Sequence, residues 1–343
     1  MFIAPGSKLI LYALQMAVKG DLLLPVPSWV SYIPQARMLK DQVIKVPTIL
    51  DDNGYQIDPE LLRQTIHQAR GEGMTPGKII LNSPNNPTGL SIPDRNMQEI
   101  AKICEEEDIL IISDEIYGFV SFDQKYRSIS RYAPAHTAIS TGLSKHFSLG
   151  GWRVGVGFIP KAVPGLYEKL CNIASELWSS VPSPIQYAVI EAYSHDTAIE
   201  DHVRDCSEIH GVINTKIAES LRSAGIKSPA PQGAFYNYPD FENYREKLYA
   251  CGITSSQHLA DTFLKKYGLA ALPGIAFAED PEKLTLRVSG CDYDGTKVLD
   301  AYRQEKNIDH DFLKSHAPNI MKQMKVFEQF IDNLEAGKIS DAV

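Results

Sequence analysis

Short apolar runs alternate with amphipathic stretches along the first half of the chain. Several runs are apolar at consecutive positions, which predicts parallel strands buried on both faces. The runs are DLLLPV, QVIKVP, KIILNS, DILIISD, TAIST and VGVGFI. Between them lie predicted helices, such as the one that Asp58 caps and Pro59 opens, and the one in SIPDRNMQEIAKICEEE. This order of elements predicts an α/β fold with a mostly parallel sheet.

The pattern changes after the sequence SSVPSPIQ. Residues 184–224 read as two helices, the second long and ending at Gly225, a residue type that commonly stops helices. A mixed segment follows, and the last helix carries Ile320, Met324, Phe327, Ile331 and Leu334 on one side. Because 343 residues exceed one compact core, we expect two domains, residues 1–212 and 213–343, with the boundary inside the long helix.

Composition narrows the classes of partner. The net charge of −8 and the pI near 5.6 argue against nucleic acid or an anionic membrane surface, and no apolar run approaches the length of a membrane span. The apolar residues 1–21 read as core and not as a signal peptide, since no basic segment precedes them. Scattered cysteines without a C-x-x-C sequence predict reduced thiols in the cytoplasm and no metal site.

Polar sequences follow several predicted strands, where open α/β sheets bind ligands. Asn86 lies in IILNSPNNPTG, and Asp114 and Tyr117 lie in ILIISDEIYGF. Each of these sequences taken alone fits a turn or a helix cap about as well as a binding site. Lys145 follows TAIST, and Arg153 comes eight residues later in the glycine-rich GLSKHFSLGGWRVG. A lone lysine is most often a solvated surface residue.

Together these side chains suit one ligand. A carboxylate can pair with a protonated ring nitrogen, and an amide and a phenol can hold a phenolate oxygen. A lysine whose pKa falls through desolvation and a nearby cation can form an imine, and an arginine can supply that cation and grip a phosphate. Pyridoxal 5′-phosphate has each of the matching groups.

Five short sequences in this order resemble the class I/II aminotransferases, which are fold-type-I pyridoxal-phosphate enzymes of the aspartate-aminotransferase superfamily. They are PSWVSY, NSPNNPTG, SDEIYGF, GLSKHFSLGGWRVG and LRVSG, and the resemblance spans residues 3 to about 300. It implies a large domain with a mostly parallel sheet, a smaller α+β C-terminal domain and a homodimer. It also implies transfer of an amino group from an amino acid to a 2-oxo acid. A lyase or decarboxylase reaction remains an alternative, as does a non-catalytic or weakly active cofactor-binding homologue.

The resemblance also implies roles for residues that contact the cofactor ring and the substrate. Lys145 matches the imine lysine and proton carrier, and Asp114 matches the partner of the ring nitrogen. Asn86 and Tyr117 match the residues that bond the ring hydroxyl. Trp29 matches the aromatic residue that stacks on the ring.

Further residues match the groups that hold the two anions. Gly6, Ser7 and Lys8 match the phosphate-binding turn at the start of a helix, and Arg153 completes the phosphate site. Arg287 matches the arginine that binds the substrate α-carboxylate, next to Asn86.

Two features depart from the family pattern. Gly142 stands where a hydroxyl residue usually precedes the lysine by three positions, so Thr141 or Ser144 would have to serve the phosphate. The chain also begins almost at the phosphate-binding turn, so it looks N-terminally shortened. We therefore expect apolar faces left exposed, a weakened dimer and low solubility or activity.

Overall fold

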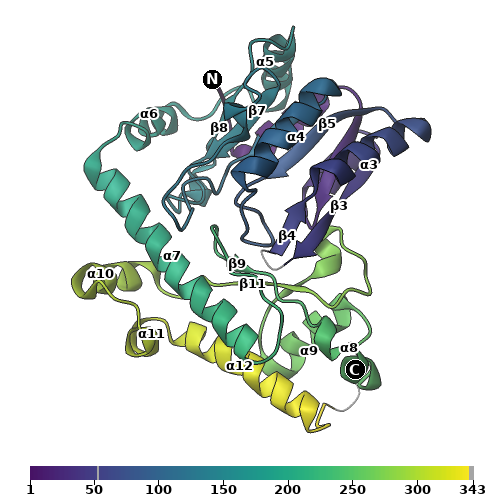
Figure 1. The fold of residues 1–343 in the computed structure, drawn as a ribbon. Coiled ribbons are helices and arrows are strands. Elements are labelled where there is room, and N and C mark those ends of the chain that lie inside the picture. The colour runs from purple at the N-terminus through teal and green to yellow at the C-terminus, as the bar shows by residue number, and fades with distance from the viewer. Residues whose placement is uncertain (52–53, 340–343) are drawn as a thin grey trace.

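The computed structural model describes residues 1–339 apart from residues 52 and 53, and its centre is an eight-stranded sheet (Figure 1). The strand order is β1-β8-β7-β6-β5-β2-β3-β4. The strands are β1 (Phe2–Ala4), β2 (Asp21–Val26), β3 (Val43–Asp51), β4 (Gly54–Ile57), β5 (Pro76–Asn82), β6 (Leu110–Asp114), β7 (Thr137–Gly142) and β8 (Gly155–Phe158). Strands β3, β2, β5, β6 and β7 run parallel, whereas β4, β8 and β1 each pair antiparallel with a neighbour. The predicted α/β fold with a mostly parallel sheet is confirmed.

Helices cover both faces of this sheet, as the unbroken apolar runs predict. Leu22 and Leu24 of β2 belong to the core on one face, and Leu23 between them belongs to the core on the other. The first core also contains α1 (Ser7–Ala17) and α5 (Leu166–Leu177), and the second contains α3 (Pro59–Gly71) and α4 (Asp94–Glu106). The predicted cap of α3 is confirmed, because the Asp58 carboxylate accepts a hydrogen bond of 2.9 Å from the Leu61 amide.

A smaller antiparallel sheet, in the order β10-β11-β9, lies among the C-terminal helices. Its strands are β9 (Tyr236–Asn237), β10 (Leu272–Pro273) and β11 (Leu286–Ser289). The remaining helices are α2 (Tyr32–Met38), α6 (Ser183–Ala192), α7 (Thr197–Ser223), α8 (Arg245–Ala250), α9 (Ser256–Tyr267), α10 (Gly295–Glu305), α11 (His310–His316) and α12 (Pro318–Glu335). Short 3₁₀ helices are η1 (Ile129–Arg131), η2 (Gly150–Trp152), η3 (Glu242–Tyr244) and η4 (Gly274–Phe277). Within the described part of the chain, no helix is long and apolar enough to cross a bilayer.

The long helix α7 connects the two sheets (Figure 1). From Ile209 onwards its apolar residues join the core formed by α9, α12 and β11. The predicted domain boundary at residue 212 falls inside this continuous helix, and the division into 1–212 and 213–343 stays a prediction.

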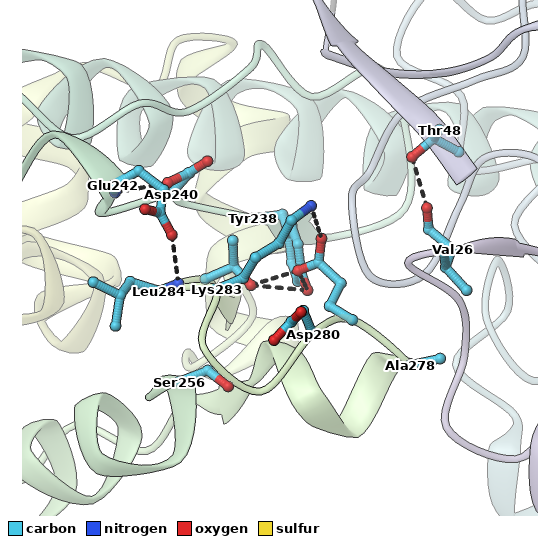
Figure 2. Close-up of polar contacts among 12 residues, drawn as sticks. Val26, Thr48, Tyr238, Asp240, Glu242, Ser256, Ala278, Asp280, Lys283 and Leu284 are labelled. Carbon is cyan, nitrogen blue, oxygen red and sulfur yellow. Dashed lines mark hydrogen bonds and ion pairs between the residues drawn. The ribbon is translucent and has the colours of Figure 1, made fainter. Parts of the chain in front are cut away.

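The small sheet approaches the large one through the segment around η4. The Ser28 amide donates to the Phe277 carbonyl over 3.0 Å, and Lys45 Nζ donates to the Ala278 carbonyl over 2.7 Å. Figure 2 shows this approach, with Val26 of the large sheet on one side and Ala278 on the other. These contacts hold the η4 segment beside the carboxyl end of β2 and the first half of β3.

A buried lysine anchors the middle of the large sheet. Lys78 of β5 is fully buried, and its ammonium group donates to the carbonyls of Val18 (2.8 Å) and Gly20 (2.6 Å) and to the Asp41 carboxylate (2.8 Å). One side chain therefore fixes the connection from α1 to β2 and the loop that leads into β3.

We expect Lys78→Met to lower the free energy of unfolding by about 3 kcal/mol, because two carbonyls and a carboxylate lose their shared donor. Urea unfolding followed by circular dichroism measures this change. Lys102→Met is the matched control, since Lys102 is exposed and only loosely paired with Glu106, and it should change the free energy by less than about 0.5 kcal/mol. Equal effects of the two substitutions would contradict the anchoring role.

Candidate active site

A cavity of about 340 Å³ opens at the carboxyl ends of the parallel strands, between the two sheets. Both sheets and the start of α1 contribute to its wall. The residues that line it are Ser7, Lys8, Trp29, Tyr32, Asn82, Asn86, Asp114, Ile116, Tyr117, Ser144, Lys145, Gly150, Arg153, Tyr236 and Arg287. Each residue expected at the site lines this cavity except Gly6, which lies directly behind Arg153.

Asp114 ends β6 with its carboxylate buried in the cavity wall. The Tyr32 hydroxyl donates to Oδ2 over 2.7 Å, and the Ile116 amide donates to Oδ1 over 3.3 Å. Burial raises the pKa of this carboxyl to about 6, although both hydrogen bonds oppose the rise. A buried carboxylate held in this way favours a cationic partner such as a protonated ring nitrogen.

Lys145 lies in the turn after β7, facing the same cavity. Its Nζ is 5.6 Å from the ring centre of Tyr117 and 5.5 Å from that of Phe235. Burial, and then the positive charge of Arg287, lower the pKa of this amine, while Asp114 opposes the shift. A larger fraction of the amine is thus neutral and nucleophilic near neutral pH.

Residues of the small sheet meet residues that follow β5 and β6 in the cavity wall. The hydroxyls of Tyr117 and Tyr236 are 2.8 Å apart. Arg287 Nη1 donates to Asn86 Oδ1 over 3.1 Å, and its guanidinium carbon lies 4.6 Å from the centre of the Tyr236 ring. Arg287 Nε is buried without a hydrogen-bond partner among the described residues, so this guanidinium retains unused capacity to bind an anion.

The part of the cavity wall at the start of α1 is suited to an anion. Helix α1 begins there at Ser7 without a side-chain cap, so its first amides are open to a ligand. Arg153, in a left-handed conformation (φ 53°), directs its guanidinium to the same place and donates to the Gly150 carbonyl over 2.7 Å. A Cβ at Gly6 would lie 2.3 Å from Arg153 Nη2, so only glycine leaves room for the guanidinium.

The structure explains the glycine at position 142. Gly142 of β7 pairs with Gly155 of β8, and a Cβ on Gly142 would lie 2.6 Å from the Val154 carbonyl oxygen. A hydroxyl residue would not fit this strand pair. Of the two alternatives, Thr141 is buried and donates to the Glu115 carbonyl over 3.3 Å, whereas Ser144 lines the cavity.

Three polar side chains of the cavity have roles that the sequence alone does not assign. Tyr32 lies within PSWVSY, so its motif was found although its contact with Asp114 was not. Asn82 precedes the sequence NNPTG and donates to the Asp114 carbonyl over 2.8 Å. Tyr236 comes from the small sheet, in a segment that carries no periodic signal.

The family model for aminotransferase class I and II matches residues 2–299. The chain belongs to this family. An aspartate aminotransferase from Bacillus subtilis is 29% identical over 83% of this chain and 70% of its own length. An aspartate/prephenate aminotransferase from Thermus thermophilus is 31% identical over 80% of this chain and 67% of its own length. A solved structure of a Thermus thermophilus aspartate aminotransferase mutant matches 95% of this chain and 79% of its own, with a TM-score of 0.76 and 26% identity.

Membership of this family confirms the expected fold type and identifies the protein as an aminotransferase. Members of the family generally depend on pyridoxal phosphate. Within the described residues, no group of three or more histidine, cysteine, aspartate or glutamate side chains could hold a metal ion.

The raised pKa of Asp114 predicts a pH dependence of stability in the cofactor-free protein. An unfolded aspartate ionises near pH 3.9, so between about pH 4 and the folded pKa of about 6 the folded state binds more protons. The free energy of unfolding should therefore fall as pH rises through this window, by about 3 kcal/mol relative to Asp114→Asn, and then level off. Urea unfolding of both proteins from pH 4 to 7 measures the difference, and parallel curves would refute it.

Proposed function

We propose that this aminotransferase binds pyridoxal 5′-phosphate in the cavity and moves an amino group between an amino acid and a 2-oxo acid. The observation that carries the proposal is the arrangement along one cavity of a buried carboxylate, a lysine with a lowered pKa and an anion-binding end. The cofactor would supply an electron sink for the negative charge that develops at the substrate α-carbon.

The fit to this cofactor rests on the chemistry of the groups that line the cavity. Asp114 would hold the proton on the ring nitrogen, and its burial makes that cation a favourable partner. Tyr117 and Asn86 would bond the ring hydroxyl, and Trp29 would pack on the ring. The amides of Ser7 and Lys8, the guanidinium of Arg153 and the hydroxyl of Ser144 would hold the phosphate, with Gly6 leaving them room.

Lys145 would have two roles, attachment of the cofactor and transfer of a proton. Its amine would hold the cofactor covalently at the aldehyde carbon, with release of water, and the same group is placed to carry the proton that leaves the substrate α-carbon. Arg287, beside Asn86, would bind the substrate α-carboxylate through two parallel hydrogen bonds. Since the relatives are named for aspartate, aspartate with 2-oxoglutarate is the first donor–acceptor pair to assay.

We expect borohydride to fix the cofactor on Lys145 in the parent protein and to leave Lys145→Ala unlabelled, because the covalent link needs this amine. Peptide mapping by mass spectrometry locates the label independently of turnover. Activity should fall by at least about a thousandfold in the same variant. Lys8→Ala is the matched control, since Lys8 lines the same cavity with its amine 5.0 Å from the Trp29 ring. Label on Lys8, or label retained in Lys145→Ala, would overturn the assignment.

We further propose that the protein is a cytoplasmic homodimer without a nucleic-acid or membrane partner. Its five cysteines are unpaired, which suits a reducing compartment and can be tested by cell fractionation. Large apolar side chains are exposed on α5, α6 and β8, which lie at one end of the molecule (Figure 1): Phe158, Tyr167, Leu177, Tyr187 and Ile190. Exposed apolar surface of this kind favours a subunit interface.

Light scattering should give the parent about twice the chain mass of 38.1 kDa. Tyr187→Glu with Ile190→Glu should give a monomer, because the new charges would enter an apolar patch that the proposed dimer interface would bury. Leu264→Glu on α9 is the control, since Leu264 is similarly exposed but lies on another helix. A monomeric parent would refute the dimer, and a double variant that stays dimeric would move the interface elsewhere.

A further inference from the structure

Tyr236 contacts both Tyr117 and Arg287 in the cavity wall. It is buried in β9, its hydroxyl lies 2.8 Å from the Tyr117 hydroxyl, and the two rings meet edge to face with centres 5.8 Å apart. On the neighbouring strand, the guanidinium carbon of Arg287 lies 4.6 Å from the centre of the Tyr236 ring. One side chain of the small sheet thus touches a residue in the turn that follows β6 and an arginine of its own sheet.

The hydroxyl pair can be oriented in two ways, and the cofactor would select one of them. Burial raises the pKa of Tyr117 well above its usual value, so this phenol keeps its proton. If Tyr117 donates that hydrogen to the ring oxygen of the cofactor, its own oxygen is left as an acceptor. Tyr236 must then donate to Tyr117, since one hydroxyl carries a single hydrogen.

We propose that Tyr236 is a positioning residue with two roles. Its hydroxyl directs the Tyr117 hydrogen toward the cofactor ring oxygen, and its ring face holds the guanidinium of Arg287 in the plane where a substrate carboxylate binds. This inference rests on the proposed function, because it assumes the cofactor and the substrate in the cavity.

The Tyr236 hydroxyl should affect the pH-dependent absorbance of the bound cofactor. A phenol that accepts a hydrogen bond donates more strongly, so Tyr236 helps Tyr117 to stabilise negative charge on the ring oxygen. Without the Tyr236 hydroxyl, that oxygen becomes more basic and holds the proton on the adjacent Lys145 nitrogen up to a higher pH. The midpoint of the pH-dependent absorbance of the bound cofactor should therefore rise.

Two substitutions separate the two roles. Tyr236→Phe removes only the hydroxyl and should raise the absorbance midpoint by about half to one pH unit, with the affinity for maleate, a dicarboxylate probe, within about twofold of the parent. Tyr236→Leu also removes the aromatic face and should weaken maleate binding by about tenfold. Both quantities come from spectrophotometric titration of the holoenzyme.

Tyr238→Phe is the matched control. Tyr238 is a buried tyrosine two residues further along the chain, and its hydroxyl donates to Glu279 over 2.7 Å outside the cavity (Figure 2). Its loss removes the same chemical group from a residue directly after β9, so a merely structural effect would appear in both variants. The control should leave the absorbance midpoint and the maleate affinity unchanged.

Each comparison tests one of the two proposed roles of Tyr236. If Tyr236→Phe and Tyr238→Phe have the same absorbance midpoint, Tyr236 does not orient Tyr117. If Tyr236→Leu binds maleate as tightly as Tyr236→Phe, its ring does not hold Arg287. Should Tyr236→Leu fail to fold, the single-atom change in Tyr236→Phe still decides the first role. A parent that takes up no cofactor at all would overturn the proposed function itself, a result distinct from either failure.

Discussion

The buried carboxylate of Asp114 is the constraint on which the rest of the site depends. Moving a charged carboxylate out of water is costly, and its pKa is raised to about 6 even with the hydrogen bonds from Tyr32 and the Ile116 amide. The parallel register sets Asn82 of β5 and Ser140 of β7 directly beside it. The sheet that buries this group therefore also brings the Asn82 amide to its backbone carbonyl and starts the turn to Lys145 beside it.

The anion-binding end is shaped by backbone packing more than by side chains. A Cβ at Gly155 would lie 2.4 Å from the Ser7 amide nitrogen, and one at Gly6 would meet Arg153. The glycines thus allow β8, the start of α1 and the arginine to occupy one small volume. The same crowding, between β7 and β8, excludes a hydroxyl side chain at position 142, so the departure from the family pattern has a local steric cause.

Much of the fold and most of the cavity could be predicted from the sequence, for reasons visible in particular residues. Consecutive leucines in β2 required two covered faces, and the polar sequences after β5, β6 and β7 met because parallel strands end at one edge. The contacts of Tyr32, Lys78 and Tyr236 could not be predicted. Each joins groups at least 37 residues apart, and neither periodicity nor spacing reports such pairs. Lys78 in particular lies in an apolar strand, where only the folded chain shows which carbonyls it satisfies.

At the cavity, residues of the small sheet pair with polar residues from the loops of the large sheet. A ligand that binds one member of a pair would therefore also affect the other member. Arg287 donates to Asn86, and Tyr236 contacts Tyr117, so these two residues of the small sheet touch residues in the loops that follow β5 and β6. A carboxylate that binds Arg287 would compete with the Asn86 oxygen for the guanidinium and free the Asn86 side chain. Any shift of Arg287 would also act on the Tyr236 ring that it stacks against, and through the hydroxyl pair on Tyr117. The contacts of Arg287 with Asn86 and of Tyr236 with Tyr117 are thus contacts that a carboxylate bound in the cavity would rearrange.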